Sequence, residues 1–354
     1  MAESPRLKRL MIVEKILVRG TNWVGDSIVT IPALRELKRI FPEAKLSLLV
    51  KPWVSGIFED ADFIDELIIY ERDRKGLVAT IRELYQKQFS LAVLFQNAFE
   101  AAFLAFGARA KLRMGFPTQH RSILLTHSLK LTQEILKLHQ IYYYLHIVSQ
   151  VEEKLFGQSR VDFDNLSYKL PVSFKRQEAI RERLLSFGID PAKRAVAINP
   201  GATNSRAKRW PAERFGALAD KLIDVGFEVV FIGAGNELDI TQAAVATMRQ
   251  KAKILTGKTS LSESIAFLSI CDLLISNDTG PAYIASAIDR PTLTIFGPTN
   301  EQMIRPFGKN AQMIRHKVDC APCMLRECPI DHRCMTGISV DMVMSYALSM
   351  LKRL

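Results

Sequence analysis

Short runs rich in Val, Ile and Leu alternate with stretches of helical periodicity along the first half of the chain. The runs are KILVRG (15–20), KLSLLV (45–50), ELIIYE (66–71), LAVLFQN (91–97) and KLRMGF (111–116). Between the first two runs, apolar residues recur three or four positions apart, at Ile28, Ile31, Leu34, Leu37 and Phe41. Strands that alternate with amphipathic helices predict a parallel α/β sheet. Residues 121–160 are expected to add further helix.

A second series of strand candidates predicts a second sheet. Its members are AVAINPG (195–201), EVVFIGAG (228–235), AKILTG (252–257), DLLISND (272–278) and TLTIFGP (292–298), with helical stretches between them. Residues 161–176 lose the periodicity and contain a proline. We therefore expect two Rossmann-like α/β domains, 1–170 and 171–338, that face each other across a cleft. A last helix is expected at 339–354, and packing back on the N-terminal domain is one arrangement open to it.

Charge narrows the classes of partner. The 354-residue chain has 48 Lys and Arg against 37 Asp and Glu, a net charge of +11. This excess predicts an acidic partner such as nucleic acid, anionic lipid or a phosphorylated substrate. The basic start of the chain lacks a signal-peptide core, and the most apolar window, 91–108, contains Gln96, Asn97 and Glu100. A cytoplasmic protein is expected.

The loop after the first strand candidate raises a chemical question. In RGTNWVGDSIVT (19–30), Gly20 and Gly25 lie five residues apart, as the glycines of a phosphate-binding loop do. Such a loop continues with Lys and then Ser or Thr, whereas this chain has Asp26 and Ser27. A carboxylate here suits a general base facing a hydroxyl group. The competing interpretation is that Asp26 caps the following helix.

Three loops of the second half place polar residues at predicted strand ends. They are NPGATNSRAKRW (199–210), IGAGNE (232–237) and SNDTGPAY (276–283). In the last, Thr279 and Gly280 open a helix whose first amides can bind phosphate. Alternatives for these loops are a helix cap at Asp278 or Thr279 and a solvated basic loop. On these features alone, an NAD-dependent oxidoreductase and a nucleic-acid-binding protein stay open, although the glycine fingerprint is incomplete and the basic residues form no single stripe.

Four motifs in order, RGTNWVGDSIVTIPALREL, NPGATNSRAKRWPAERF, FIGAGNE and SNDTGPAYIASA, resemble those of glycosyltransferase family 9, the heptosyltransferases. The ending CAPCMLRECPIDHRCM is similar to that of the heptosyltransferase II branch. The resemblance implies a GT-B fold and inverting, metal-independent transfer of heptose. The implied donor is ADP-L-glycero-D-manno-heptose, and the implied acceptor is the anionic inner core of a lipopolysaccharide precursor at the cytoplasmic face of the inner membrane. It implies no cofactor and no nucleic acid.

The resemblance also implies roles for individual residues. Asp26 matches the catalytic aspartate. Lys208 matches the lysine that neutralises the leaving diphosphate, and Glu237 the glutamate at the ribose. The remaining donor-binding matches are Asp278, Thr279 and Gly280. Relatives often have His where this chain has Tyr283, so a cationic donor at that position is in doubt.

Acceptor binding is predicted for polar and basic residues of the first domain. Asn97 ends the fourth strand candidate, and RAKLRMGFPTQHR (109–121) supplies Arg113 and Arg121. These cations suit phosphate or carboxylate groups of the acceptor. The alternative is a solvated face that is attracted to anionic lipid.

Two other patterns suggest metals and are not favoured. Cys320, Cys323, Cys328 and Cys334 could hold a structural zinc, but the second pair lacks regular zinc-ribbon spacing. Asp162-Phe163-Asp164 is a DxD sequence, which metal-dependent glycosyltransferases of another fold use. It falls in the predicted connection between domains, so we interpret it as chance.

Overall fold

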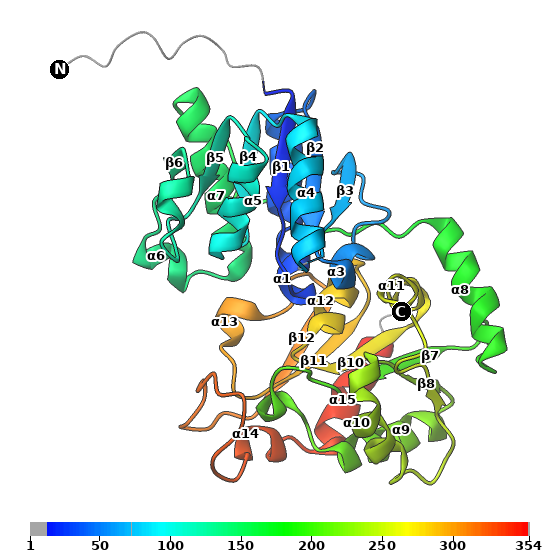
Figure 1. The fold of residues 1–354 in the computed structure, drawn as a ribbon. Helices are drawn as coiled ribbons and strands as arrows, with labels where there is room; N and C mark the ends of the chain where they lie inside the picture. The colour runs from blue at the N-terminus through cyan, green and yellow to red at the C-terminus, as the bar shows by residue number, and fades with distance from the viewer. Residues whose placement is uncertain (1–12, 72, 353–354) are drawn as a thin grey trace.

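The chain folds into two units, each built on a six-stranded parallel sheet, in a computed structural model that describes residues 13–71 and 73–352 (Figure 1). The first sheet contains β1 (Lys15–Arg19), β2 (Lys45–Val50), β3 (Glu66–Ile69), β4 (Leu91–Leu94), β5 (Leu112–Gly115) and β6 (His127–Ser128). Its helical segments are α1 (Val24–Val29), α2 (Ile31–Ile40), α3 (Pro52–Ser55), α4 (Arg74–Lys87), α5 (Phe99–Gly107), η2 (Arg121–Leu124), α6 (Gln133–Lys137) and α7 (Gln140–Phe156).

The second sheet contains β7 (Ala195–Asn199), β8 (Glu228–Phe231), β9 (Lys253–Ile254), β10 (Leu273–Asn277), β11 (Thr292–Phe296) and β12 (Ala311–Arg315). Its helical segments are α8 (Phe174–Ser186), η3 (Arg206–Lys208), α9 (Ala212–Asp224), η4 (Gly235–Glu237), α10 (Leu238–Val245), α11 (Leu261–Ile270), α12 (Gly280–Ala287), α13 (Glu301–Ile304), α14 (Arg333–Thr336) and α15 (Val340–Leu351). None of the helices in the described part of the chain is long and apolar enough to cross a membrane.

Both sheets have the same strand order. The first runs β3-β2-β1-β4-β5-β6, and the second, read from β9, runs β9-β8-β7-β10-β11-β12. The order reverses between β1 and β4 and again between β7 and β10. Ligands of such sheets bind at the carboxyl ends of the strands that flank this reversal. The topology therefore directs attention to the loops after β1, β4, β7 and β10.

All ten predicted strands are present, and the structure adds two. Strand β6 has only two residues, which is too short for a periodic pattern. Strand β12 lies at the edge of the second sheet and is only partly buried, so its sequence shows no strong alternation of apolar and polar residues. The helical region expected at 121–160 is interrupted by β6 and by irregular chain before α6 and α7.

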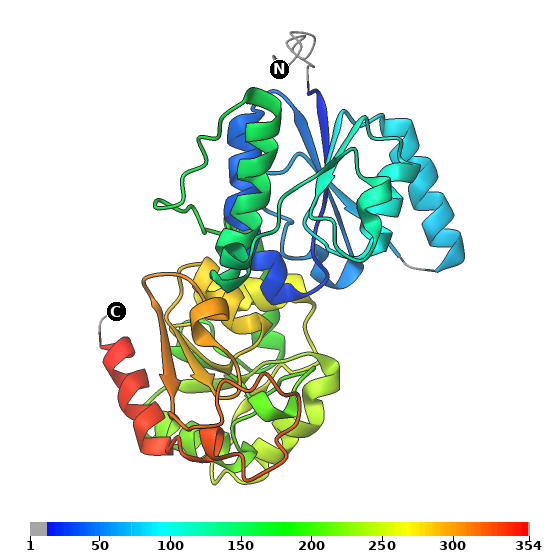
Figure 2. The same ribbon diagram turned by 90° about the vertical axis from the view of Figure 1, so that its left-hand side faces the viewer.

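The last helix corrects an expectation. Residues Val343, Ala347 and Met350 of α15 belong to the apolar core of the second unit, where α15 packs on α9 and β10. Figure 2 shows α15 along the side of the lower unit. The proposed return to the N-terminal domain is therefore wrong, because the apolar face of this helix is already buried within its own domain.

The two units contact each other directly. Helix α7 packs on α2 of the first unit, residues 157–173 form the connection, and α8 packs on α11 of the second. One apolar cluster continues across the boundary and includes Ile28 and Tyr144 from the first unit with Tyr283 and Ile284 from the second. Backbone contacts reinforce it, since the Leu170 amide donates to the Ala287 carbonyl at 2.9 Å.

The core of the second unit predicts a test with a matched control. Trp210 is fully buried, packs edge to face on Phe215 at 4.9 Å and donates from Nε1 to the Ile338 carbonyl. Trp210→Ala should lower the free energy of unfolding by about 3–5 kcal/mol because it leaves a cavity. Trp53→Ala removes a side chain that is 57% exposed and should cost less than about 1 kcal/mol. Urea denaturation monitors both, and equal effects would contradict the described core.

Candidate active site

The site begins at the loop that joins β1 to α1. The Gly20 amide donates to the Leu49 carbonyl at 3.0 Å, and the buried Thr21 and Ser27 hydroxyls are 2.9 Å apart. These bonds fix the turn that carries Asp26. The N-cap of α1 is Trp23, which makes no side-chain cap bond, and Asp26 lies within the first turn. Asp26 is therefore not the cap, and the capping interpretation is wrong.

Helix α1 meets α12 of the other domain at very short range. A Cβ on Gly25 would lie 3.2 Å from the Tyr283 ring, and a Cβ on Gly280 would lie 2.9 Å from Val24. Real Cβ atoms essentially never come as close as 2.9 Å, and a contact of 3.2 Å is tighter than most, so glycine suits both positions where the helices face each other. The two glycines bring the carboxylate-bearing loop of the first domain against the β10–α12 loop of the second.

The Asp26 carboxylate is partly buried and accepts no hydrogen bond from the residues that the structure describes. Burial raises its pKa from the ordinary 3.8 to about 6, and the positive charge of Lys208 opposes this shift. The buried Tyr144 has a raised pKa, first because of burial and then because of the Asp26 charge. An unpaired carboxylate with a pKa near neutrality is suited to accept a proton at physiological pH.

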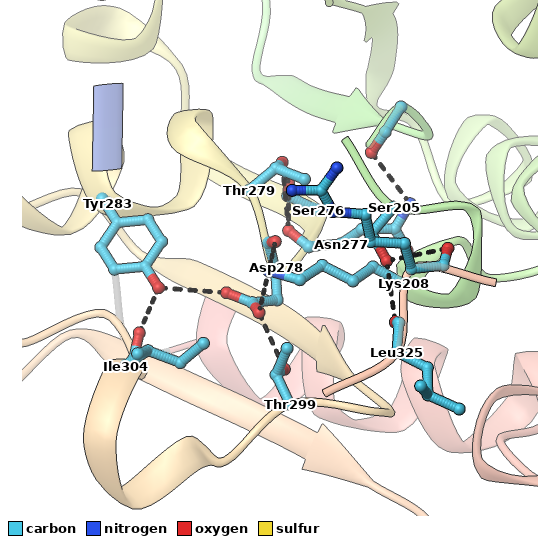
Figure 3. Close-up of polar contacts among 12 residues, drawn as sticks. Ser205, Lys208, Ser276, Asn277, Asp278, Thr279, Tyr283, Thr299, Ile304 and Leu325 are labelled. Atoms are coloured by element: carbon cyan, nitrogen blue, oxygen red, sulfur yellow. Dashed lines mark hydrogen bonds and ion pairs between the residues drawn. The ribbon is translucent and has the colours of Figure 1, made fainter. Parts of the chain in front are cut away.

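On the opposite side of the interface, Asp278 is the centre of a polar cluster (Figure 3). Its buried carboxylate pairs through Oδ2 with Lys208 Nζ at 2.8 Å. Thr299 Oγ1 donates to the same oxygen at 2.8 Å, and the Tyr283 hydroxyl lies 3.1 Å from Oδ1. The cluster holds Lys208 at the domain interface with its side chain still 24% exposed.

Tyr283 occupies the position where a cationic donor was in doubt. Its hydroxyl lies between Asp278 Oδ1 and the Ile304 carbonyl, and burial raises its pKa well above the usual range. The side chain is thus a neutral phenol. It orients Asp278 and packs against Gly25, and it contributes no positive charge.

The turn after Asp278 leaves two amides free. Pro281 occupies one of the first positions of α12, and Thr279 is its N-cap without a side-chain cap bond. Thr279 Oγ1 instead faces Asn199 Oδ1 at 3.3 Å. Within the described residues, the backbone amides of Thr279 and Gly280 donate to no protein acceptor. Such amides at a helix N-terminus can bind phosphate oxygens.

Glu237 is buried beside the same loops. Its Oε1 accepts from Thr203 Oγ1 and its Oε2 from the Ala234 amide, both at 3.1 Å. A Cβ on Gly201 would fall 2.2 Å from the Glu237 carboxyl carbon, so a larger residue here would displace the Glu237 carboxylate. A cavity of about 690 Å³ adjoins this point. Its lining includes Thr203, Asn204, Arg209, Asn236 and Asp239.

The predicted acceptor-binding residues Asn97 and Arg121 differ in how far they are buried. Asn97 lies after β4 and donates from Nδ2 to the Tyr143 hydroxyl at 2.7 Å. Arg121 is fully buried, and its guanidinium donates to the carbonyls of Phe116 and Gln96 and to Asn97 Oδ1. Burial lowers its pKa to about 10. With no exposed surface, Arg121 positions the loop that carries Asn97, which corrects the expectation of direct acceptor contact for this residue.

Arg113 is partly buried and also bonded to backbone. Nε donates to the Leu124 carbonyl at 2.7 Å and Nη1 to the Ala110 carbonyl at 2.6 Å. The guanidinium carbon lies 5.5 Å from the centre of the Phe106 ring. Arg113 is thus placed on the α5 side of the domain, and its contact with an acceptor stays a prediction.

The sequence interpretation missed several residues at the site. Asn277 joins the loops after β7 and β10, because it accepts from the Trp210 amide at 3.0 Å and donates to the Pro200 carbonyl at 2.9 Å. Trp23 and Trp53 are more than half exposed, and Trp53 Nε1 donates to the carbonyl of Asn22, which lies in the same loop as Asp26. The sequence feature that could have identified them is a tryptophan in or beside a loop at a strand end, which is an unusual place for a large apolar side chain.

The two sequence patterns that suggested a metal are the C-terminal cysteines and Asp162-Phe163-Asp164. Among the described residues, no group of three or more His, Cys, Asp or Glu side chains is arranged to hold a metal ion. Cys320 and Cys323 are exposed, while Cys334 is buried. Asp162 Oδ1 accepts from the amides of Asp164 and Asn165, so the DxD sequence forms a turn in the interdomain connection.

Comparison with known proteins decides the family. The model of glycosyltransferase family 9 (heptosyltransferase) matches residues 77–333. The chain belongs to this family. It is therefore a glycosyltransferase, and its two sheets are the two halves of a GT-B fold.

Named relatives cover most of the chain. A lipooligosaccharide heptosyltransferase 2 of Campylobacter jejuni is 28% identical over 96% of this chain and 98% of its own. A lipopolysaccharide heptosyltransferase 2 of Salmonella typhimurium is 26% identical over 86% of this chain and 90% of its own. The solved structure of E. coli ADP-heptose lps heptosyltransferase II superposes with a TM-score of 0.84 at 22% identity, covering 96% of this chain and 99% of that one.

The charge of Lys208 should have a measurable effect on the pKa of Asp26 in this family 9 site. Lys208 lowers the pKa of Asp26, so Lys208→Met should raise the Asp26 titration midpoint above its value of about 6. Carbon-13 NMR of labelled Asp carboxyls measures it, with Asp26→Asn to assign the signal. Lys258→Met, an exposed lysine of the same domain, should leave the midpoint unchanged. An unshifted midpoint in Lys208→Met would show that the two side chains do not face each other.

Proposed function

We propose that this family 9 enzyme transfers heptose from ADP-L-glycero-D-manno-heptose to the inner core of a lipopolysaccharide precursor, with inversion at the anomeric carbon and without a metal. The observation that carries the proposal is the position of Asp26 across the domain interface from Lys208 and the first amides of α12. In the described part of the chain, neither the partly buried Asp26 carboxylate nor these amides have a hydrogen-bond partner. The names of the relatives, which specify ADP-heptose and lipopolysaccharide for those proteins, support the choice of substrates.

The donor half of the site suits a nucleotide diphosphate. Lys208 Nζ has three N–H donors and pairs with Asp278, so it can still donate to a phosphate oxygen. The amides of Thr279 and Gly280 supply two further donors. From the described residues, the Glu237 carboxylate accepts two hydrogen bonds, which leaves it able to accept from the ribose hydroxyls as well. As the bond between the anomeric carbon and the diphosphate breaks, these donors stabilise the negative charge that develops on the leaving group.

The acceptor half supplies the base. An inverting transfer needs the acceptor hydroxyl to attack the face of the sugar opposite the diphosphate. Asp26 lies on α1, facing the donor domain, and we assign it to remove the hydroxyl proton as the new bond forms. Asn97, after β4, and the exposed rings of Trp23 and Trp53 are assigned to hold the acceptor sugars. The acceptor lipid would place the enzyme at the cytoplasmic face of the membrane.

The direct assay mixes purified protein with ADP-heptose and an inner-core acceptor, and mass spectrometry should detect one added heptose with release of ADP. The rate should persist in EDTA, and proton NMR of the product should show the anomeric configuration inverted relative to the donor. Failure to release ADP in the presence of acceptor would contradict the proposed substrates, and retention of configuration would contradict the mechanism.

Removal of the proposed base is the sharpest mutational test. Asp26→Asn keeps the shape of the side chain but cannot accept the proton, so turnover should fall about 10²–10⁴-fold while ADP binding is retained. Burial disfavours the ionised carboxylate, so the stability cost of Asp26 is absent at low pH and complete once the pH rises above about 6. At pH 8 the Asn variant should therefore be at least as stable as the wild type.

The control for this test is Asp62→Asn, which changes an exposed carboxylate paired with Arg35 in the same domain. It should keep nearly full activity. If Asp26→Asn retained more than about a tenth of the wild-type rate, less than about 1.4 kcal/mol of the barrier would depend on the carboxylate. Another group would then have to accept the proton.

A further inference from the structure

Helix α5 exposes an aromatic face that the catalytic site does not use. Phe99, Phe103 and Phe106 are 42%, 39% and 50% exposed, and their spacing of four and then three residues places them on one side of the helix. The opposite side is buried through Ala101, Ala102, Leu104 and Ala105. Large apolar residues usually turn inward, so three phenylalanines in a row on the outer side require an explanation.

The aromatic face continues onto the adjoining segment η2. Helix α5 contacts η2, where Ile123 is 80% exposed, and the Phe99 amide donates to Gln119 just before that segment. We call the set Phe99, Phe103, Phe106 and Ile123 the α5 patch. It is a surface of the N-terminal domain alone, formed by the two segments that follow β4 and β5.

Basic residues border the α5 patch. The Arg113 guanidinium lies over the Phe106 ring, and the Arg109 guanidinium lies 5.3 Å from the Tyr85 ring on neighbouring α4. Lys111 is exposed between them. Residues 99–133 contain one acid, Glu100, against four basic side chains that reach the surface, Arg109, Lys111, Arg113 and Lys130. Glu100 lies 3.9 Å from the buried Lys51, so its charge is directed toward the protein.

The α5 patch is also continuous with the acceptor side of the active site. Helix α5 starts two residues after Asn97, at the carboxyl end of β4, where the strand order of the sheet reverses. From there it runs about 13 Å along the domain surface, given the rise of a nine-residue helix. A surface that held the patch would therefore lie beside the place where the acceptor enters.

We infer that the α5 patch is a membrane-docking surface, with its phenylalanines inserted at the headgroup boundary and Arg109, Lys111 and Arg113 on the phosphates of anionic lipids. Apolar insertion beside basic side chains is the chemistry of interfacial binding to anionic bilayers. The reason for such a surface rests on the proposed function, because an enzyme that acts on a lipid-linked acceptor has to approach the bilayer that holds it. Membrane binding itself can be measured without any acceptor.

The test uses the full chain and vesicles of phosphatidylethanolamine with about one third phosphatidylglycerol, compared with vesicles of phosphatidylcholine alone. The wild type should co-sediment with the anionic vesicles and bind the neutral ones at least about ten-fold more weakly. Phe103→Ser/Phe106→Ser should reduce binding to anionic vesicles about ten-fold or more. Arg109→Gln/Lys111→Gln should reduce it and weaken its dependence on salt.

The matched control is Phe174→Ser/Leu185→Ser on α8, which changes side chains that are 74% and 62% exposed elsewhere on the molecule. It should bind vesicles as the wild type does. All variants alter exposed side chains, so their melting temperatures should agree. Phe103→Ser/Phe106→Ser should also retain the wild-type rate on a soluble, deacylated acceptor, which separates a failure of docking from a failure of the proposed reaction.

Three results would overturn the inference. The first is the absence of wild-type binding to anionic vesicles, and the second is equal loss of binding in the α8 control. The third is a wild-type dimer in light scattering that Phe103→Ser/Phe106→Ser converts to monomer without change in vesicle binding, because the α5 patch would then be a contact between two copies of the chain.

Discussion

The contact between α1 and α12 is the constraint on which the site depends. Gly25 faces the Tyr283 ring at 3.2 Å and Gly280 faces Val24 at 2.9 Å, measured from a Cβ placed on each glycine, so a side chain has little or no room at either position. This approach withdraws Asp26 from water and so raises its pKa, and it sets the carboxylate within electrostatic reach of Lys208. The same Tyr283 that packs on Gly25 also contacts Asp278, the partner of Lys208. Asp26 and Lys208 are therefore positioned through one shared interface.

The repeated topology explains why the four loops of the site come from four particular strands. Each sheet reverses its strand order once, between β1 and β4 or between β7 and β10. Asp26 and Asn97 follow the first pair, while Lys208 and Asp278 follow the second. Buried polar side chains then hold the loops in place, with Arg121 supporting Asn97 and Asn277 joining the two loops of the donor domain. The residues of the site lie in the segments that follow these strands, and buried polar side chains fix the geometry of those segments.

Sequence periodicity predicted what depends on local pattern. The ten strands were found because each is a short apolar run. Asp26, Lys208 and Asp278 were singled out because they lie in polar or glycine-rich loops that follow such runs, and their roles came from the resemblance to family 9. Packing between distant segments was not predictable in this way. The docking of α15 on α9 and the burial of Arg121 depend on contacts between residues far apart in the chain. Trp23 and Trp53 were visible in the sequence, but only the structure shows that they are exposed and that Trp53 contacts the loop of Asp26.

We propose that burial at the domain interface makes Asp26 a base that works near neutral pH. The pH dependence of kcat/KM tests this most directly, because it reports ionisations of the free enzyme. With a pKa of about 6, Asp26 loses activity on protonation, so kcat/KM should be constant above about pH 7 and fall ten-fold per pH unit below about pH 6. The residual activity of Asp26→Asn should lack this acidic limb. If the acidic fall in kcat/KM of the wild type were centred near pH 4, as for a solvated carboxylate, Asp26 would not be a base with a raised pKa. The same acidic fall in the Asn variant would show that another group causes it.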